Sequence, residues 1–98
     1  MNTTQERPEL APLKVGKEFK TFTVTGKKGM EMPTHISTKE AVVIVQEGSA
    51  LLKIDGKEQT LEKEGVYIIP EKVAHSLLLL SDFKAVALMA VDSEIEFV

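Results

Sequence analysis

Short runs of apolar residues, separated by turn residues at close spacing, make up most of this chain. Residues 19–25 alternate between two faces, and residues 41–45 form one continuous apolar run. Further short runs with β-forming residues cover 30–37, 50–54, 58–61, 66–69, 74–80, 85–91 and 95–98. Asp55-Gly56 lies between two of them and is a strong hairpin signal. No segment has a convincing 3.6-residue apolar period, so the pattern predicts eight or nine short strands.

Such a chain must close a barrel or pack two sheets, because a single antiparallel sheet would leave an apolar face in water. The fold class predicted is therefore all-β, a small antiparallel β-barrel or sandwich. Residues 1–12 are polar, contain Pro8 and Pro12, and have no sustained period, which predicts an N-terminal arm over residues 1–16, with a short helical turn or an added edge strand as alternatives. Residues 17–98 are expected to form one barrel domain.

Composition narrows the class of protein. The net charge of −3 gives no electrostatic reason to bind nucleic acid or an anionic membrane. The absence of cysteine excludes disulfides, thiolate metal sites and cysteine nucleophiles. No apolar run approaches the roughly 18–20 residues of a membrane span. The polar N-terminus lacks the apolar core of a secretory signal, which predicts a cytoplasmic protein.

The two histidines of the chain, His35 and His75, are its best candidates for chemistry. Each lies downstream of a glycine in a stretch with strand character, and strands forty residues apart can be neighbours in a small all-β fold. Neutral imidazole is the commonest transition-metal ligand, so a converging pair would indicate a metal site.

The segments around these histidines resemble the two motifs of the cupin family. The first motif, G-x5-H-x-H-x3/4-E-x6-G, is matched by Gly29, His35, Glu40 and Gly48, with Ser37 in place of the second histidine and altered spacing on both sides of Glu40. The second, G-x5-P-x-G-x2-H-x3-N, is matched in Gly65–His75, with one residue fewer before the proline. There, Lys72 replaces the second glycine and Leu79 the final asparagine. The resemblance covers roughly residues 17–91 and implies a jelly-roll barrel, a double-stranded β-helix.

The resemblance also implies a metal centre with His35, His75 and Glu40 as ligands. Two imidazoles and a carboxylate suit Fe, Mn or Ni, and Zn is chemically possible too. The changed spacing turns Glu40 away from the histidines unless a bulge restores it, and Gln46 is an alternative oxygen donor. His35 and Ser37 share a face, so the serine removes one inward ligand. A metal-free pocket with hydrogen-bonded histidines is the other interpretation.

Three functions remain open from the sequence. The first is a binding module whose barrel holds a divalent metal, a small-molecule ligand or both. The alternative is a metal-dependent enzyme, a dioxygenase, isomerase or lyase, using His35 and His75 with Glu40. A sensory domain acting with a partner is a third possibility. The apolar runs 42–45 and 77–80 would place apolar side chains on both faces of their strands. The outer face then needs a cover, which predicts a homodimer in which a second copy packs against it.

Overall fold

The computed structural model describes residues 7–98, and every regular element in this range is a β-strand. The ten strands are β1 (Glu9–Val15), β2 (Phe19–Gly26), β3 (Glu31–Ser37), β4 (Ala41–Glu47), β5 (Ser49–Ile54), β6 (Lys57–Glu62), β7 (Val66–Ile69), β8 (His75–Leu79), β9 (Phe83–Ala90) and β10 (Ile95–Phe97). Nine of them coincide with the predicted runs. The tenth, β1, lies in the expected N-terminal arm, whose residues 1–6 fall outside the described residues.

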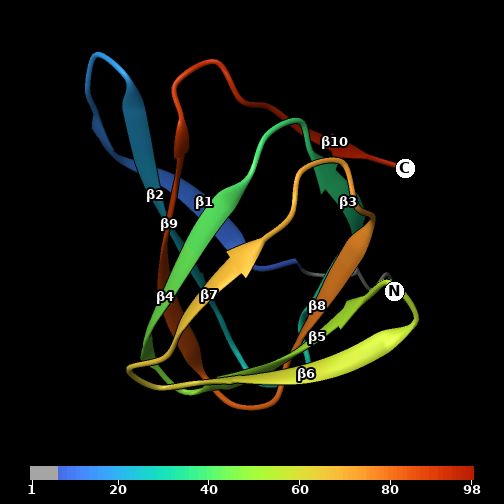
Figure 1. The fold of residues 1–98 in the computed structure, drawn as a ribbon. Coiled ribbons are helices and arrows are strands. Elements are labelled where there is room, and N and C mark those ends of the chain that lie inside the picture. Colours follow the sequence, from blue (N-terminus) through green and yellow to red (C-terminus); the bar gives the residue numbers. More distant parts are fainter. Residues whose placement is uncertain (1–6) are drawn as a thin grey trace, which may run out of the picture.

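Two five-stranded antiparallel sheets face each other (Figure 1). The first sheet has the order β1-β2-β9-β4-β7, and the second has the order β10-β3-β8-β5-β6. β1 pairs with β2 along its length, so residues 9–15 of the expected arm form an added edge strand. The all-β architecture predicted from the sequence is confirmed. No helix long and apolar enough to cross a membrane occurs in residues 7–98.

The core lies between the two sheets and follows the two-residue period of the strands. In β9, residues Phe83, Ala85, Ala87 and Met89 are buried, whereas the residues between them face outward. The facing strands of both sheets complete the core with Val24, Ala41, Val45, Ala50, Leu52, Leu61, Ile69 and Leu79. Small residues in the middle of β9 leave room between the sheets, and that room is where the candidate site lies.

Tight turns at two glycines flank β5. The Asp55-Gly56 hairpin forms as predicted, with both residues at positive φ (54° and 73°), as a two-residue type I′ turn requires. Gly48, the closing glycine of the first motif, has φ 78°, and a Cβ there would overlap the carbonyl oxygen of Asp82. This position therefore needs glycine for its conformation and also for its close contact.

Candidate functional site

The pairing of β3 with β8 brings the two histidines together. His35 and His75 are directly opposite each other in the register, after a bulge in β3 between Met32 and His35. Their ring centroids are 4.2 Å apart with an interplanar angle of 61°. Both side chains are buried on the inner face of the second sheet. The predicted proximity of the two histidines is confirmed.

Each imidazole is oriented by the backbone of its own segment. Nδ1 of His35 lies 2.7 Å from the carbonyl oxygen of Pro33, and Nδ1 of His75 lies 2.9 Å from that of Val73. A carbonyl oxygen only accepts, so Nδ1 carries the hydrogen in both rings, and Nε2 of the neutral ring keeps its lone pair. Hydrogen bonding of this kind is also what orients histidines that bind metals.

The two Nε2 atoms belong to histidines that line the space between the sheets. Neither has a hydrogen-bond partner within residues 7–98. Among residues 7–98, every side-chain nitrogen or oxygen that is fully enclosed has a hydrogen-bond partner. Since the two Nε2 atoms have none, they are not fully enclosed. They are free acceptors that a ligand can reach.

Burial keeps both histidines in the neutral form. Desolvation lowers the pKa of His35 and of His75 below the usual 6.5, and it outweighs the hydrogen bonds to Pro33 and Val73, which raise the pKa. The neighbouring His75 lowers the pKa of His35 further by charge repulsion. At neutral pH the pair is uncharged and offers two acceptor nitrogens.

The histidines line a cavity of about 70 Å³ inside the barrel. This volume exceeds the roughly 10–15 Å³ that one water needs. Apart from the histidines and Ser37, the lining is apolar, and it includes Phe22, Met32, Leu77, Ala87, Met89 and Ile95. The cavity therefore combines a small polar end with apolar walls, as small-molecule sites do.

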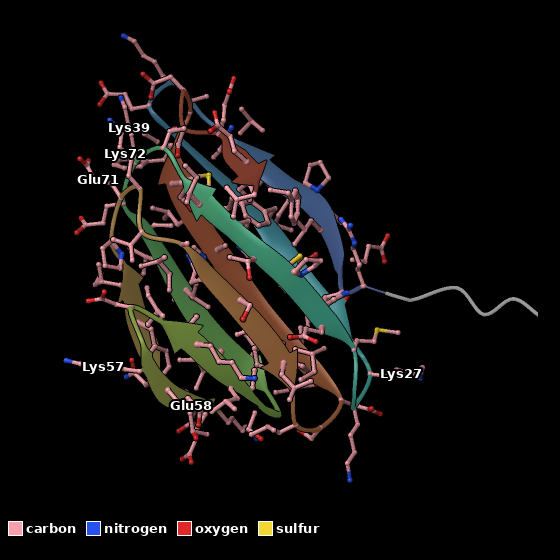
Figure 2. The ribbon with its side chains drawn as sticks, turned by 90° about the vertical axis from the view of Figure 1, so that its right-hand side faces the viewer. Lys27, Lys39, Lys57, Glu58, Glu71 and Lys72 are labelled. Carbon is pink, nitrogen blue, oxygen red and sulfur yellow. The ribbon has the colours of Figure 1, made fainter. Side chains whose placement is uncertain are left out.

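The other candidate ligands lie in different places. Ser37 is buried on the same face as His35 and lines the cavity, as predicted from the two-residue period. Glu40 is exposed in the turn before β4, so the structure does not bring it to the histidines. Its neighbour Lys39 lies at the same end of the barrel as Lys72 (Figure 2) and pairs with Asp92 at 2.8 Å.

Gln46, the alternative donor, is also exposed and does not line the cavity, so that suggestion is wrong. The odd-numbered residues of β4 (Ala41, Val43 and Val45) face the core, and the even-numbered positions therefore face outward. Within residues 7–98, no three side chains of His, Cys, Asp or Glu come together as a possible metal site.

Two residues near the pair were missed by the sequence reasoning. Phe97 of β10 pairs with His35 in the register, and the two ring centroids are 5.3 Å apart. The guanidinium carbon of Arg7 lies 5.0 Å from the centre of the Phe97 ring, a cation–π contact. Alternation in the last run predicts a strand at Phe97, but no sequence signal indicates which strand it pairs with or that Arg7 reaches it.

Comparison with known proteins identifies the fold. A family model described as "Cupin domain" matches residues 22–91. Among solved structures, an uncharacterised conserved protein with a double-stranded β-helix domain from Klebsiella pneumoniae has a TM-score of 0.84 at 14% identity, covering 99% of this chain and 84% of its own. An RmlC-like cupin protein from Desulfovibrio desulfuricans has a TM-score of 0.75 at 22% identity, covering 92% and 90%.

A larger enzyme shares the same fold. Salicylate 1,2-dioxygenase from Pseudaminobacter salicylatoxidans has a TM-score of 0.70 at 20% identity, with 81% of this chain matching 25% of the dioxygenase. Likeness at this identity shows a common double-stranded β-helix fold and nothing of activity. No curated protein sequence matches the chain.

Proposed function

The chain belongs to the cupin family, and from that premise we propose that its barrel is a binding module for a small molecule held by His35 and His75. The observation that carries the proposal is the arrangement of the two imidazole rings, which are held by backbone hydrogen bonds. Both Nδ1 atoms bond to the backbone, and both Nε2 atoms remain free acceptors at a cavity with apolar walls. Such a site binds the polar group of a ligand directly and buries the remainder of the molecule.

The residues present do not fit the metal centre expected from the family resemblance. Catalytic metal sites generally use three protein ligands with one open position. Here Fe, Mn, Ni or Zn would find two imidazole nitrogens and the hydroxyl of Ser37, a weak ligand. The dioxygenase, isomerase or lyase alternative needs Glu40 beside the histidines, and Glu40 is exposed. Direct binding of an organic ligand therefore accounts better for the pair than metal-assisted catalysis.

The test is to identify what the protein holds when it is purified without chelator or affinity-tag metal. Mass spectrometry of the molecules released on denaturation is combined with elemental analysis. We expect a small molecule that accompanies the wild type and is lost from His35→Phe/His75→Phe, which keeps an aromatic ring at each position but removes both acceptors. His75→Phe alone gives a milder variant, and circular dichroism verifies that each variant is folded.

Glu40→Gln is the matched control, because it removes the third candidate ligand from an exposed position. We expect it to retain the small molecule at the wild-type level. Near-stoichiometric metal that disappears in both the histidine and the Glu40 variants would overturn the proposal in favour of the metal centre. A wild type that releases neither metal nor organic compound would also contradict it.

We also propose that a second copy of the chain covers the outer face of the first sheet. Six apolar side chains of β4, β7 and β9 adjoin there, and we refer to them as the outer apolar face: Val42, Ile44, Val66, Ile68, Val86 and Leu88. Ile44, Val66 and Ile68 are 37%, 62% and 55% exposed. The six include no charged residue, so two copies can meet around a two-fold axis without opposing like charges.

A further inference from the structure

The histidine cavity adjoins an apolar groove on the side where β1 and β10 are the outermost strands of their sheets. The groove has a volume of about 310 Å³ and is lined by residues of β1, β2, β9 and β10 together with Ser93. Four side chains line both spaces: Leu10, Phe22, Met89 and Ile95. The cavity and the groove are therefore adjacent, and a shift of these shared side chains would give a molecule bound at the histidines an apolar path for a chain that extends beyond the cavity.

The inner end of this path selects a hydrogen-bond donor. Nε2 of His35 and Nε2 of His75 are both acceptors, since both Nδ1 atoms already donate to carbonyl oxygens. A carboxylate placed there would bring its oxygens against two nitrogen lone pairs. A hydroxyl group would donate to either nitrogen, and two neighbouring hydroxyls would match both.

The charge of the surroundings selects a neutral donor. The cavity lining contains no Asp, Glu, Lys or Arg among the described residues. An ammonium or a carboxylate would therefore lose its hydration without gaining an opposite charge, which is costly. Lys20 lines the groove, and its Nζ donates a hydrogen bond to the carbonyl oxygen of Ser93 at 2.7 Å. A neutral hydroxyl avoids this desolvation cost.

The size of the cavity favours an aliphatic group at the end of the ligand that lies beside the histidines. Its volume of about 70 Å³ is roughly half of the 150 Å³ cavity that holds benzene in another protein. An aromatic ring does not fit beside the histidines without displacing their neighbours. A short carbon chain that carries one or two hydroxyls does fit.

We infer that the ligand is a neutral aliphatic alcohol or vicinal diol, with its hydroxyls on His35 and His75 and its chain in the groove along Leu10 and Ile95. The inference rests on the small-molecule site proposed above and adds the chemical class of its ligand. The hydroxyl donates its hydrogen to Nε2, and the groove removes the chain from water.

The test follows the ring nitrogens of a ¹⁵N-labelled protein in long-range ¹H–¹⁵N spectra during titration with hexane-1,2-diol. Hexanoate and hexylammonium are matched probes of similar length that carry a charge. We expect the diol to shift Nε2 of at least one histidine and the methyl groups of Leu10 and Ile95. The charged probes are expected to bind at least about tenfold more weakly, because hexanoate has no hydrogen to donate to Nε2 and both charged groups lose their hydration in the uncharged cavity.

Val15→Glu separates the groove from the head-group site, because Val15 lines the groove and not the histidine cavity. We expect this substitution to weaken the binding of hexane-1,2-diol by about tenfold, equivalent to two buried methylenes. Ethane-1,2-diol, which fills only the cavity, should shift the ring nitrogens of Val15→Glu as it does in the wild type. The comparison stays valid because an exposed edge strand tolerates this substitution better than the core does.

Three results would overturn the inference. Hexanoate that binds as well as the diol would exclude the alcohol class while leaving a small-molecule site at the histidines. Methyl shifts without ring-nitrogen shifts would exclude the histidines as the head-group site. If no probe changes any ring nitrogen, the alcohol assignment is wrong, and the released compound then decides the proposed function independently.

Discussion

His35 and His75 are held in the same way, each by a carbonyl oxygen two residues earlier in its own segment. This local arrangement does not depend on a ligand, so the tautomer is set before anything binds. Pre-set acceptors lose little entropy on binding, which favours recognition by hydrogen bonds. The same burial that makes the pair a good acceptor also makes protonation unfavourable.

Stability should therefore decrease when the pH falls from 7.5 to 5.5. The unfolded chain titrates its histidines near pH 6.5, whereas burial lowers the pKa of both in the folded state. Below about pH 6.5 the unfolded chain binds more protons, so the stabilising contribution present above that pH is lost as the pH falls toward the folded pKa values. Urea unfolding at both pH values measures the difference.

His35→Phe/His75→Phe is the control for this pH dependence. Because the variant has no histidine, its stability should be nearly constant between pH 7.5 and 5.5, where the carboxylates of the chain remain ionised. A variant that loses as much stability as the wild type would show that other groups cause the change.

At the scale of elements, the loop between β7 and β8 contains a strained residue. Lys72 has φ 61°, in the left-handed region, at the position where the second cupin motif has glycine. In this conformation the Lys72 N–H donates to the carbonyl oxygen of Ser37 at 2.7 Å. A side chain in this conformation destabilises the folded state by about 1–2 kcal/mol. Glycine would recover only part of this free energy, because its flexible backbone also favours the unfolded state.

Lys72→Gly is expected to stabilise the protein by about 0.5–1 kcal/mol. This corresponds to a rise in Tm of roughly 2–8 °C for a domain of this size. Glu71→Gly, the matched change at the preceding residue (Figure 2), has no positive φ to relieve and should lower Tm. Thermal unfolding followed by circular dichroism compares the two, and a lower Tm for Lys72→Gly would contradict the assignment of strain.

The strands that carry the site were predictable to different degrees. The two-residue period of β3 placed His35 and Ser37 on one face, and the order of the motifs placed His75 beside them. For Glu40 the sequence left two outcomes, because the changed spacing turns it away from the histidines unless a bulge restores it, and the geometry of the short turn between β3 and β4 decides between them. That turn directs Ala41 and Val43 inward and leaves Glu40 exposed.

The contribution of the outermost strands could not be read from the sequence either. Alternation shows which residues of a strand share a face, but it does not show which strand lies alongside. The apolar positions of β10 predicted a strand, whereas the stacking of Phe97 on His35 follows only from its pairing with β3. Leu10 likewise reaches the cavity because β1 adds to β2.

At the scale of the whole molecule, the two sheets differ in their outer faces. The run at 42–45 was predicted to be buried on both sides, yet Ile44 is exposed in the single chain, next to Val66 of β7. On the second sheet, Leu78 is outward and half-buried, beside Leu51 and Glu31. The larger uncovered apolar surface is thus on the first sheet, which favours that sheet as the contact between two copies.

Ile68→Lys should therefore convert a dimer into a monomer. In a two-fold contact through the outer apolar face, the substitution places a charge from each copy in a desolvated interface, whereas in a lone chain this exposed position accepts lysine readily. Light scattering on a sizing column gives the mass, with 10.8 kDa for one chain. Wild type should have twice that mass and a Tm that rises with concentration.

Leu78→Lys provides the comparison, because it introduces the same charge on the outer face of the second sheet. It should remain dimeric if the first sheet forms the contact. A wild type that is monomeric at all concentrations, or a dimer lost through Leu78→Lys and retained by Ile68→Lys, would contradict this assignment. The second of these results would move the contact to β3, β8 and β5, on the sheet that carries both histidines.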